Sequence, residues 1–375
     1  MLKNNAISKN IFVNSTATTS GGALTVLSQF LNDIPLYDKV NTYYIFCTAQ
    51  EIQKYQSDNI KIIKDAYKRK WIGRICWDNV GLEKWIKDNQ IEPDLIVSLQ
   101  NTGVRLGKNV KQIIYYHQSL PMYDYKWSIL NNQERKLWLY KNIYPWFVRK
   151  NFHKKDILVV QSEWMKEASN RVFKISLDRI KVIKPAIQLQ EFIRKEERGA
   201  EDNKTFKIIY PAFNMAFKNH KIIYEALMII YQKRKDIYDN IKLFLTIGKK
   251  DFIQMNNVAM GNNIEFLGNL EYSKLMELYP EMDLMLFPSY LETAGLPLLE
   301  AAHFGLPIIV SDLPYARETA DGYEGARFII YDDAEAWADA IIDSYNTRKK
   351  YESFISQNHD SWSEMFELIK QQLLK

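Results

Sequence analysis

Short runs of apolar residues recur along the whole chain, and apolar residues return every three or four positions in most of the segments between them. Apolar runs of this length are typical of strands buried on both faces, and the periodic segments are typical of amphipathic helices. Their alternation predicts an α/β fold with a mostly parallel sheet. In the first half of the chain the predicted strands are Asn10–Asn14, Tyr43–Cys47, Ile60–Ile63, Leu95–Ser98, Gln112–Tyr116 and Ile157–Val160.

The second half of the chain repeats the alternation after a highly charged stretch, EFIRKEERGAEDNK, at residues 191–204. Such a stretch is typical of a solvated linker, and 375 residues are enough for two domains of ordinary size. We therefore expect one domain over residues 1–190, a second over 191–355, and a final helix over 356–375 with Trp362 and Phe366 on its apolar face. The predicted strands of the second domain are Lys207–Tyr210, Leu243–Ile247, Leu284–Phe287, Ile308–Val310 and Phe328–Tyr331.

The stretch from Asp283 to Asp312 carries the strongest functional signal. A buried strand ends at Pro288, a loop follows, and a helix is predicted between Pro297, a good first helical residue, and Gly305, a good residue after a helix end. A loop between a parallel strand and the next helix lies where α/β proteins bind ligands. The stretch therefore predicts a ligand site in this loop.

Two carboxylates stand eight residues apart in this stretch, Glu292 in the loop and Glu300 about one turn into the helix. The helix amides attract an anion such as phosphate. Carboxylates repel a phosphate, so they more plausibly accept hydrogen bonds from hydroxyl groups of a sugar or ribose. Taken singly, each residue would fit a solvated surface position equally well.

The ETAGLPLLE motif with the following FGLPIIVSD resembles the signature of the retaining GT-B glycosyltransferases, in particular family 4. The resemblance implies two Rossmann-like domains facing across a cleft, with the final helix crossing back to the first domain. It implies that the first domain binds a glycan or lipid-linked acceptor and that the second binds a nucleotide sugar of UDP, GDP or dTDP type. Glu300 would hold the donor ribose, and the donor loop would comprise Glu292, Thr293, Ala294, Gly295 and Leu296.

Three further places in the chain match the resembled family. Gly21 and Gly22 open a helix after the first strand, where the family's loop faces the donor phosphates. Lys218, near the start of the first helix of the second domain, would bind the diphosphate; the family commonly has an arginine upstream of it, where this chain has Asn214 and Met215. Phe266 and Leu267 would receive the base through backbone groups.

His117 ends its predicted strand in QIIYYHQSLPMYDYKW, and the family usually has a histidine here against the donor sugar. We accordingly expect His117, Lys218 and Glu292 to be the catalytic residues. Aromatic faces stack on the apolar faces of sugars, so Tyr123, Tyr125 and Trp127 are acceptor candidates, with ordinary packing as an equal alternative.

The segment Arg135–Lys155 holds seven Lys and Arg residues and no acid, interleaved with aromatic residues such as Trp138 and Trp146. This mixture suits an anionic membrane surface. It would also suit single-stranded nucleic acid, or a packed helix pair with a solvated basic face. We favour the membrane and expect no nucleic-acid partner.

The charge of the chain is unevenly divided. Residues 1–190 hold 29 Lys and Arg against 16 Asp and Glu, net +13, and the remainder is net −8, in agreement with +5 for the chain. Cys47 and Cys76 lack metal-ligand spacing and are predicted to be buried thiols in a reducing compartment. With no long apolar run and no secretory signal, the expected location is cytoplasmic, with peripheral contact at the inner face of the cell membrane.

These features favour a retaining hexosyltransferase in bacterial O-antigen or capsule polysaccharide synthesis. No Asp-x-Asp metal motif occurs, so no cofactor and no essential metal are expected. Two other classes of protein remain open. One is a nucleotide-sugar epimerase of the same fold, and the other is a non-catalytic protein that binds membrane or nucleic acid through the basic segment.

Overall fold

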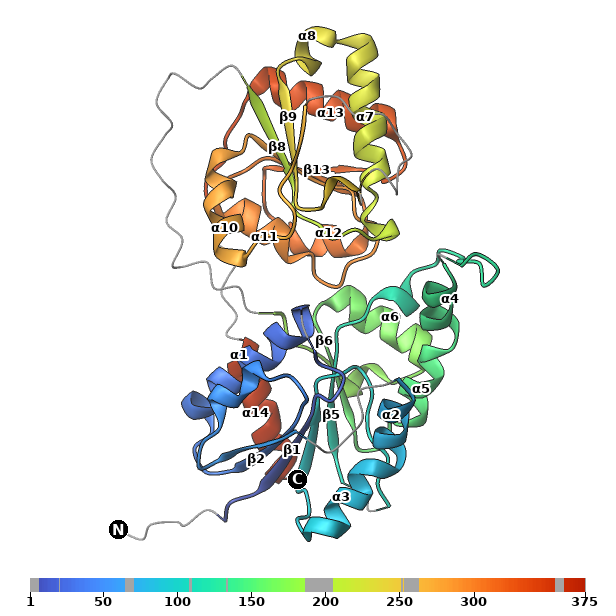
Figure 1. Ribbon diagram of the computed structural model, residues 1–375, viewed down its shortest axis with the longest axis vertical. Helices are drawn as coiled ribbons and strands as arrows, with labels where there is room; N and C mark the ends of the chain where they lie inside the picture. Colours follow the sequence, from blue (N-terminus) through green and yellow to red (C-terminus); the bar gives the residue numbers. More distant parts are fainter. Residues whose placement is uncertain are drawn as a thin grey trace. The chain divides into compact units, whose positions relative to one another are not determined.

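The computed structural model describes residues 7–19, 21–64, 71–107, 110–132, 134–185, 205–250, 252, 263–354 and 361–374. The chain forms two compact units. The first comprises residues 1–186 with 359–375, and the second comprises residues 187–358. Each unit is an α/β layer structure around one parallel sheet, as the hydrophobic pattern predicted (Figure 1).

The first unit is built on a seven-stranded sheet in the order β3-β2-β1-β4-β5-β6-β7, and every strand pair is parallel. The strand order reverses between β1 and β4, which is the topological switch point of this sheet. Its strands are β1 (Asn10–Asn14), β2 (Thr42–Phe46), β3 (Ile60–Ile63), β4 (Leu95–Ser98), β5 (Gln112–Tyr116), β6 (Ile157–Val160) and β7 (Ile180–Val182). Its helices are α1 (Gly21–Tyr37), α2 (Trp71–Cys76), α3 (Leu82–Asn89), α4 (Arg135–Asn142), α5 (Tyr144–Lys150), α6 (Glu163–Phe173) and α14 (Ser361–Leu374), with a π-helical turn at Trp77–Gly81 and short 3₁₀ turns at Glu51–Tyr55, Leu120–Met122 and Leu177–Arg179.

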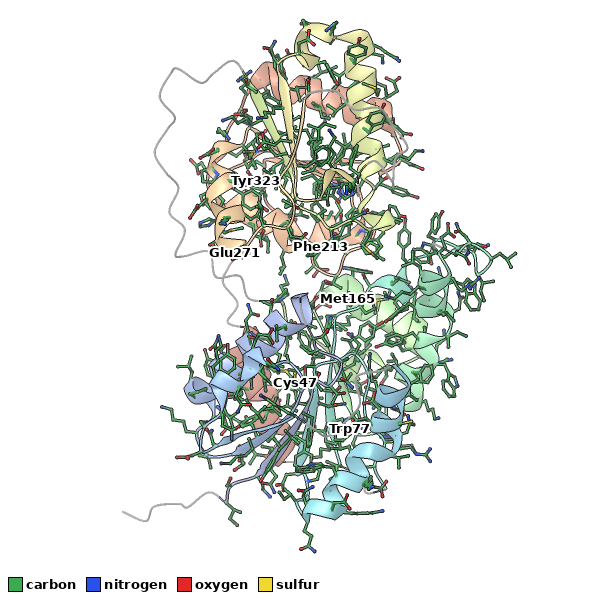
Figure 2. All side chains as sticks on the ribbon, viewed as in Figure 1. Cys47, Trp77, Met165, Phe213, Glu271 and Tyr323 are labelled. Atoms are coloured by element: carbon green, nitrogen blue, oxygen red, sulfur yellow. The ribbon has the colours of Figure 1, made fainter. Side chains whose placement is uncertain are left out.

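Side chains of the first sheet alternate between two apolar layers because successive strand residues point to opposite faces. In β1, Ile11 and Val13 belong to the layer under α1 and α14, whereas Phe12 belongs to the opposite layer with Trp77 and Leu82. Trp77 is labelled inside this unit in Figure 2. Both faces of the sheet are therefore covered, as the continuous apolar runs require.

The last helix of the chain, α14, packs against α1 and β4 of the first unit. The rings of Phe30 and Phe366 stack with their centroids 5.2 Å apart, and Trp362 meets Phe30 edge-on at 5.5 Å. Met365 and Ile369 are fully buried on the same helix face. The apolar face predicted for this helix is thus part of the first unit's core.

The second unit is built on a six-stranded parallel sheet in the order β10-β9-β8-β11-β12-β13, with the switch point between β8 and β11. Helix α7 packs against α13, and α11 packs against α12. Its strands are β8 (Phe206–Tyr210), β9 (Ile241–Leu245), β10 (Ile264–Phe266), β11 (Leu284–Phe287), β12 (Ile308–Ser311) and β13 (Ala326–Ile329). Its helices are α7 (His220–Lys233), α8 (Lys235–Tyr238), α10 (Tyr272–Leu278), α11 (Leu296–His303), α12 (Pro314–Thr319) and α13 (Ala334–Thr347), with 3₁₀ turns at Ala216–Lys218 and Tyr279–Glu281.

One prediction about the thiols was wrong. Cys47 is buried after β2, but Cys76 is exposed. Cys76 is the last residue of α2, directly before the π-helical turn that carries Trp77 into the core, so its own side chain points outward. Among the described residues, none of the helices has the length and apolar character needed to cross a bilayer.

Candidate donor site at the switch point of the second sheet

The two loops that leave β8 and β11 meet at the carboxyl edge of the second sheet, because these strands are parallel neighbours. The backbone N–H of Tyr290, after β11, donates to the carbonyl of Phe217, after β8, at 2.9 Å. The hydroxyl of Ser289 donates to the same carbonyl at 3.3 Å. The hydroxyl of Tyr210 at the end of β8 donates to the carbonyl of Lys218 at 2.6 Å. These bonds hold the two loops in one fixed arrangement at the place where α/β folds bind ligands.

Lys218 and Glu292 form an ion pair across this junction. Their side chains are only 14% and 15% exposed, so the pair is shielded from solvent. The ammonium of Lys218 also lies 5.8 Å from the ring centroids of Phe217 and Phe287. A shielded pair of opposite charges presents both a cation and a hydrogen-bond acceptor to a ligand in the same place.

The start of α11 is shaped by Gly295, which has φ +62° and precedes the first helical residue. A Cβ at this position would come within 3.1 Å of the Tyr315 ring, so glycine is required both for its conformation and for its size. The hydroxyl of Tyr315 donates to the carbonyl of Ser289 at 2.7 Å, which fixes the ring that sets this limit. The loop therefore brings the N-terminal end of α11, which begins at Leu296, to the same edge as Lys218 and Glu292.

Within this loop, Ala294 is buried and its carbonyl accepts a hydrogen bond from Thr319, while Thr293 and Leu296 are partly exposed. These residues connect Glu292 to the first turn of α11 without leaving the sheet edge. The predicted donor loop is thus one continuous segment of the second unit.

Glu300 lies in α11 and is only 6% exposed. The hydroxyl of Tyr279 donates to its Oε2 at 3.1 Å, and Tyr272 also donates to the carboxylate. Burial raises the pKa of Glu300 from 4.5 to about 7, and the two tyrosine hydrogen bonds offset part of that increase. Glu300 is therefore a buried acceptor positioned by two tyrosines.

Tyr272 and Tyr279 carry no recognisable site signal in the sequence. Their place in α10 and in the turn after it fits ordinary helix packing, and only the fold brings them to Glu300.

Phe266 is the last residue of β10, the edge strand of the same sheet, and Leu267 follows it. Both are partly exposed, and the Leu267 N–H donates to the Leu245 carbonyl at 2.8 Å. Gly268 follows with φ +65° and turns the chain away from the strand. In the loop after β8, Phe213 is 68% exposed and Met215 is 41% exposed. Phe213 is labelled in Figure 2.

The remaining predicted site residues belong to the first unit. His117 follows β5, its N–H donates to Asn101 Oδ1 at 2.6 Å, and its Nε2 lies 3.4 Å from the Leu99 carbonyl oxygen. Burial lowers the pKa of its imidazole. Gly22 lies in the first turn of α1, which begins at Gly21, and a Cβ on Gly22 would meet no heavy atom within 4 Å.

The aromatic acceptor candidates contact one another. Tyr125 and Trp127 have ring centroids 5.2 Å apart, and the centroid of Tyr123 lies 6.2 Å from that of Trp127. Trp127 is buried, whereas Tyr125 is 44% exposed. Lys141 of α4 donates to the Tyr125 carbonyl at 2.8 Å and anchors the loop. Only Tyr125 offers a largely open ring face to a ligand.

A buried polar network at the switch point of the first sheet was not predicted from the sequence. Asp78, on the π-helical turn, accepts hydrogen bonds from Asn14 at 3.1 Å and from Gln100 at 2.9 Å. Gln100 Oε1 in turn accepts from the Thr16 hydroxyl at 3.0 Å and from the Ala17 N–H at 2.9 Å. The network fixes the loop between β1 and α1. Asp78 gave no signal in the sequence, because its burial depends on the π-helical turn.

Comparisons with known proteins agree with this architecture. Residues 190–360 match the family model described as glycosyl transferases group 1. Among solved structures, the chain is similar to a sucrose-phosphate synthase from Thermosynechococcus elongatus, with a TM-score of 0.67 at 17% identity over 98% of this chain and 96% of that one. It is similar to WaaG, a glycosyltransferase involved in lipopolysaccharide biosynthesis, with a TM-score of 0.65 at 14% identity over 96% and 95% of the two chains. It is also similar to Anabaena Alr3699/HepE in complex with UDP and glucose, with a TM-score of 0.59 at 14% identity over 98% of each chain.

Two parallel α/β units with these strand orders define the GT-B fold, which confirms the predicted fold class. The match to the group 1 glycosyl transferases covers residues 190–360, which span most of the second unit. One curated relative, the O-antigen chain mannosyltransferase RfbU of Salmonella typhimurium (strain LT2), is 25% identical over 192 residues. That match spans half of this chain and half the length of the relative.

Proposed function

We propose that the protein transfers a sugar from a nucleotide-sugar donor to a carbohydrate or lipid-linked oligosaccharide acceptor, with retention of configuration at the anomeric carbon. The single observation that carries this proposal is the shielded Lys218–Glu292 pair at the β8/β11 switch point, directly before the start of α11. A diphosphate needs a cation and helix amides, and a sugar needs a carboxylate acceptor. Lys218, the N-terminal end of α11 and Glu292 would provide these groups at one edge of the sheet.

Lys218 and the Leu296 N–H at the start of α11 would stabilise the negative charge that grows on the departing diphosphate. The helix dipole adds to this effect because its positive end is at the same place. Fixed donors of this kind act mainly in the transition state, so they raise turnover more than ground-state affinity.

Glu292 would accept a hydrogen bond from a hydroxyl of the donor sugar, and Glu300 from the ribose hydroxyls. Because Glu300 is held by Tyr272 and Tyr279, its carboxylate would be presented in a fixed orientation. Backbone groups at Phe266 and Leu267 would receive the base. A donor of UDP, GDP or dTDP type is compatible with this arrangement.

The first unit would bind the acceptor, with Gly21, Gly22 and His117 on the donor side and Tyr123, Tyr125 and Trp127 as aromatic contacts. In the reaction, the acceptor hydroxyl attacks the anomeric carbon from the face that the diphosphate leaves. Its proton passes to the departing phosphate oxygen, so no additional base is consumed. This same-face displacement gives retention without a carboxylate nucleophile.

The curated relative is named for O-antigen chain synthesis and one structural neighbour for lipopolysaccharide biosynthesis. We therefore place the proposed reaction in bacterial O-antigen or capsule polysaccharide synthesis, on the cytoplasmic side of the cell membrane. Among the described residues, no group of three or more His, Cys, Asp or Glu side chains is arranged to hold a metal ion. Independence from metal stays a prediction, which transfer assays with and without EDTA would test.

Thermal-shift titration with UDP-, GDP- and dTDP-sugars tests the proposal first, followed by transfer assays in which NMR gives the anomeric configuration of the product. One donor class should raise the melting temperature of the wild type and of Glu324→Ala, a change at an exposed acid, but not of Glu300→Ala. Inversion at the anomeric carbon would contradict the retaining mechanism. Epimerised nucleotide sugar without acceptor would indicate the epimerase, and absence of any donor binding would indicate the non-catalytic class.

A further inference from the structure

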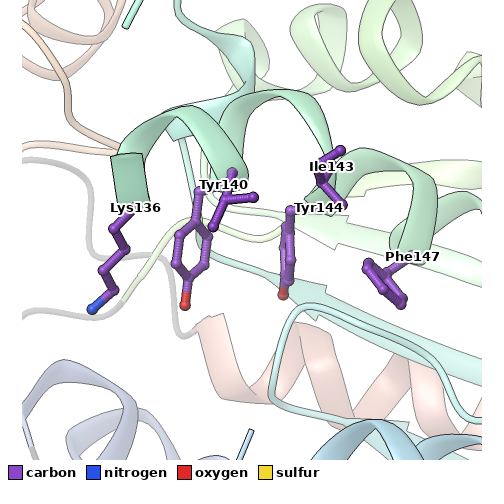
Figure 3. A pocket seen from close by; sticks show the side chains of 6 residues that line it. Lys136, Tyr140, Ile143, Tyr144 and Phe147 are labelled. Atoms are coloured by element: carbon purple, nitrogen blue, oxygen red, sulfur yellow. The ribbon is translucent and has the colours of Figure 1, made fainter. Parts of the chain in front are cut away.

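A pocket of about 420 Å³ in the first unit lies outside the residues assigned above. Its described lining comes entirely from α4, α5 and the residue that joins them: Lys136, Leu139, Tyr140, Ile143, Tyr144 and Phe147 (Figure 3). The volume falls within the range of about 300–1,000 Å³ that is usual for small-molecule sites. The spacing of these residues places them on one continuous face of the two helices.

Helices α4 and α5 pack on the core of the first unit through the face opposite the pocket, which leaves the pocket-lining face uncovered. Leu137, Pro145 and Val148 are buried, and Val148 belongs to the apolar layer under β5 and β6. In contrast, Leu139 and Ile143 are 45% and 40% exposed. Leu139 and Ile143 are therefore not part of the first unit's core, whereas Tyr144 packs against it.

The pocket is polar at one end. Figure 3 shows the Lys136 ammonium and the hydroxyls of Tyr140 and Tyr144 directed to the same side, away from the helix backbones. Behind them, Arg74 of α2 donates from Nη2 to the Tyr144 hydroxyl at 3.4 Å, and its side chain is 16% exposed. Asp78 faces the other side of the guanidinium, with its Oδ2 3.9 Å from Arg74 Nε. The polar end thus combines two hydroxyls with a net positive charge contributed by Lys136.

An occupant has to satisfy both ends. A small anion would leave Leu139, Ile143 and Phe147 against water, and a neutral hydrocarbon would use neither the ammonium nor the hydroxyls. A hydrocarbon chain that ends in a phosphate matches the apolar walls and the basic end together. The basic character of the first half of the chain, net +13, favours an anionic molecule over a cationic one.

We propose that the pocket formed by α4 and α5 binds a lipid phosphate, with the hydrocarbon between Leu139, Ile143 and Phe147 and the phosphate beside Lys136, Tyr140 and Tyr144. This inference rests on the proposed function, because it names the lipid carrier of the acceptor as the molecule that the first unit holds. The pocket would bind the lipid phosphate without any chemical reaction there.

Calorimetric titration of the full chain with farnesyl phosphate, below the concentration at which it aggregates, tests the inference. Farnesol and inorganic phosphate serve as the two half-probes. Farnesyl phosphate should bind more tightly than either. Ile143→Asn should lower its affinity about tenfold or more, the usual effect of losing one buried apolar side chain. Because Ile143 is already 40% exposed, this change leaves the core intact.

Leu177→Asn is the matched control, since Leu177 is also 40% exposed in the first unit and does not line the pocket. Its affinity for farnesyl phosphate should stay within twofold of the wild type. Lys136→Glu should weaken farnesyl phosphate and leave farnesol unchanged. Equal losses in Ile143→Asn and Leu177→Asn would show non-specific adsorption to the protein surface and overturn the pocket. Equal affinity for farnesol would overturn the phosphate end, and no binding of farnesyl phosphate would overturn the whole inference.

The two proposals fail separately. If sugar nucleotides raise the melting temperature but farnesyl phosphate does not bind, the pocket is wrong and the transferase proposal stands. If farnesyl phosphate binds as described but no sugar nucleotide does, the pocket stands and the transferase proposal is wrong. Ile143→Asn should in either case leave donor binding unchanged, because Ile143 is not among the residues proposed to contact the donor.

Discussion

Lys218 and Glu292 lie 74 positions apart in the sequence and form an ion pair at the carboxyl edge of the second sheet. Lys218 is carried by the loop after β8 and Glu292 by the loop after β11, and the pairing of those two strands brings them together. Each charge satisfies the other in a partly desolvated place, so removal of either partner leaves a costly unpaired charge. The two residues therefore have to be tested by different substitutions.

Lys218→Ala should lower the rate of glycosyl transfer by about tenfold or more and weaken donor binding less, because charge on the diphosphate develops in the transition state. Steady-state kinetics that separate kcat from KM measure this. Lys221→Ala is the control: Lys221 lies in the same helix region, is 72% exposed and pairs with Glu225. A rate within twofold of the wild type would remove Lys218 from phosphate stabilisation.

Glu292→Gln should not weaken binding of the nucleoside diphosphate without its sugar, in contrast to Lys218→Ala. Replacing the carboxylate with an amide leaves Lys218 available to a diphosphate, so the nucleoside diphosphate should bind at least as tightly as to the wild type. Transfer should nevertheless fall, because the amide is a weaker acceptor for a sugar hydroxyl. Calorimetry with the nucleotide and a transfer assay give the two readouts. Weaker nucleotide binding together with unchanged transfer would contradict both roles.

Glu300→Gln should stabilise the protein at pH 8 and weaken donor binding. The pKa of Glu300 is about 7 in the folded chain against 4.5 ordinarily, so between these values the folded state holds a proton that the unfolded state releases. The free energy of unfolding consequently falls as pH rises from 4.5 to 7, and the penalty is complete above 7. Glutamine removes this penalty, which is on the order of 1–3 kcal/mol.

The stability difference between Glu300→Gln and the wild type should vanish near pH 4.5, where both side chains are neutral. Denaturant unfolding at pH 4.5 and pH 8 measures it, with Glu324→Gln as a control at an exposed acid. Donor affinity should fall by about 1–2 kcal/mol in Glu300→Gln at pH 8, the effect of losing a charged acceptor. A stability gain that is the same at both pH values would mean that ionisation of Glu300 is not its cause.

Gly295→Ala should destabilise the second unit by about 1–3 kcal/mol, because φ +62° is unfavourable for alanine and its Cβ would crowd Tyr315. Gly22→Ala offers a contrast within the same chain, since nothing lies within 4 Å of its Cβ. That variant should unfold at or above the wild-type temperature while binding donor or acceptor less well. Thermal melts of both variants check the prediction, and similar destabilisation at the two positions would contradict it.

The segment Arg135–Lys155 should bind anionic bilayers. Six of its seven basic residues are exposed, Lys141 being held by the loop before α4, and Trp146 lies exposed among them. Each basic residue near an anionic surface contributes about 1 kcal/mol, which fades over a Debye length. Vesicle sedimentation should show binding to anionic vesicles that falls steeply with salt. Equal, weak binding to neutral and anionic vesicles would contradict the prediction and indicate that the segment is a packed helix pair with a solvated basic face.

Much of the fold could be predicted from the sequence, because its strands are short apolar runs that few other structures explain. The unit from β11 through α11 to β12 was predicted almost to its ends, since Pro297 and Gly305 mark the limits of the helix. Boundaries were less accurate where residues of intermediate polarity flank a strand. Leu243–Ile247 was predicted, for example, and β9 covers Ile241–Leu245.

The sequence indicated candidate site residues in several segments, but it did not indicate the contacts between them. Glu292, Gly295 and Glu300 are neighbours in the chain, and their spacing indicated a ligand loop. The pairing of Lys218 with Glu292 depends on strand order, which hydrophobic patterns do not encode. The hydrogen bonds from Tyr279 to Glu300 and from Gln100 to Asp78 likewise join segments that are distant in the sequence.

The return of α14 to the first unit has a consequence for synthesis of the protein. A ribosome releases residues 1–186 long before residues 361–374, yet Phe30 has its stacking partner, Phe366, in that late segment. Until then Phe30, Leu31 and Ile34 of α1 lack the apolar cover that Met365 and Ile369 later provide. The nascent first unit would therefore expose an aromatic groove while the entire second unit is being translated, and chaperones that recognise such surfaces would have their longest opportunity there.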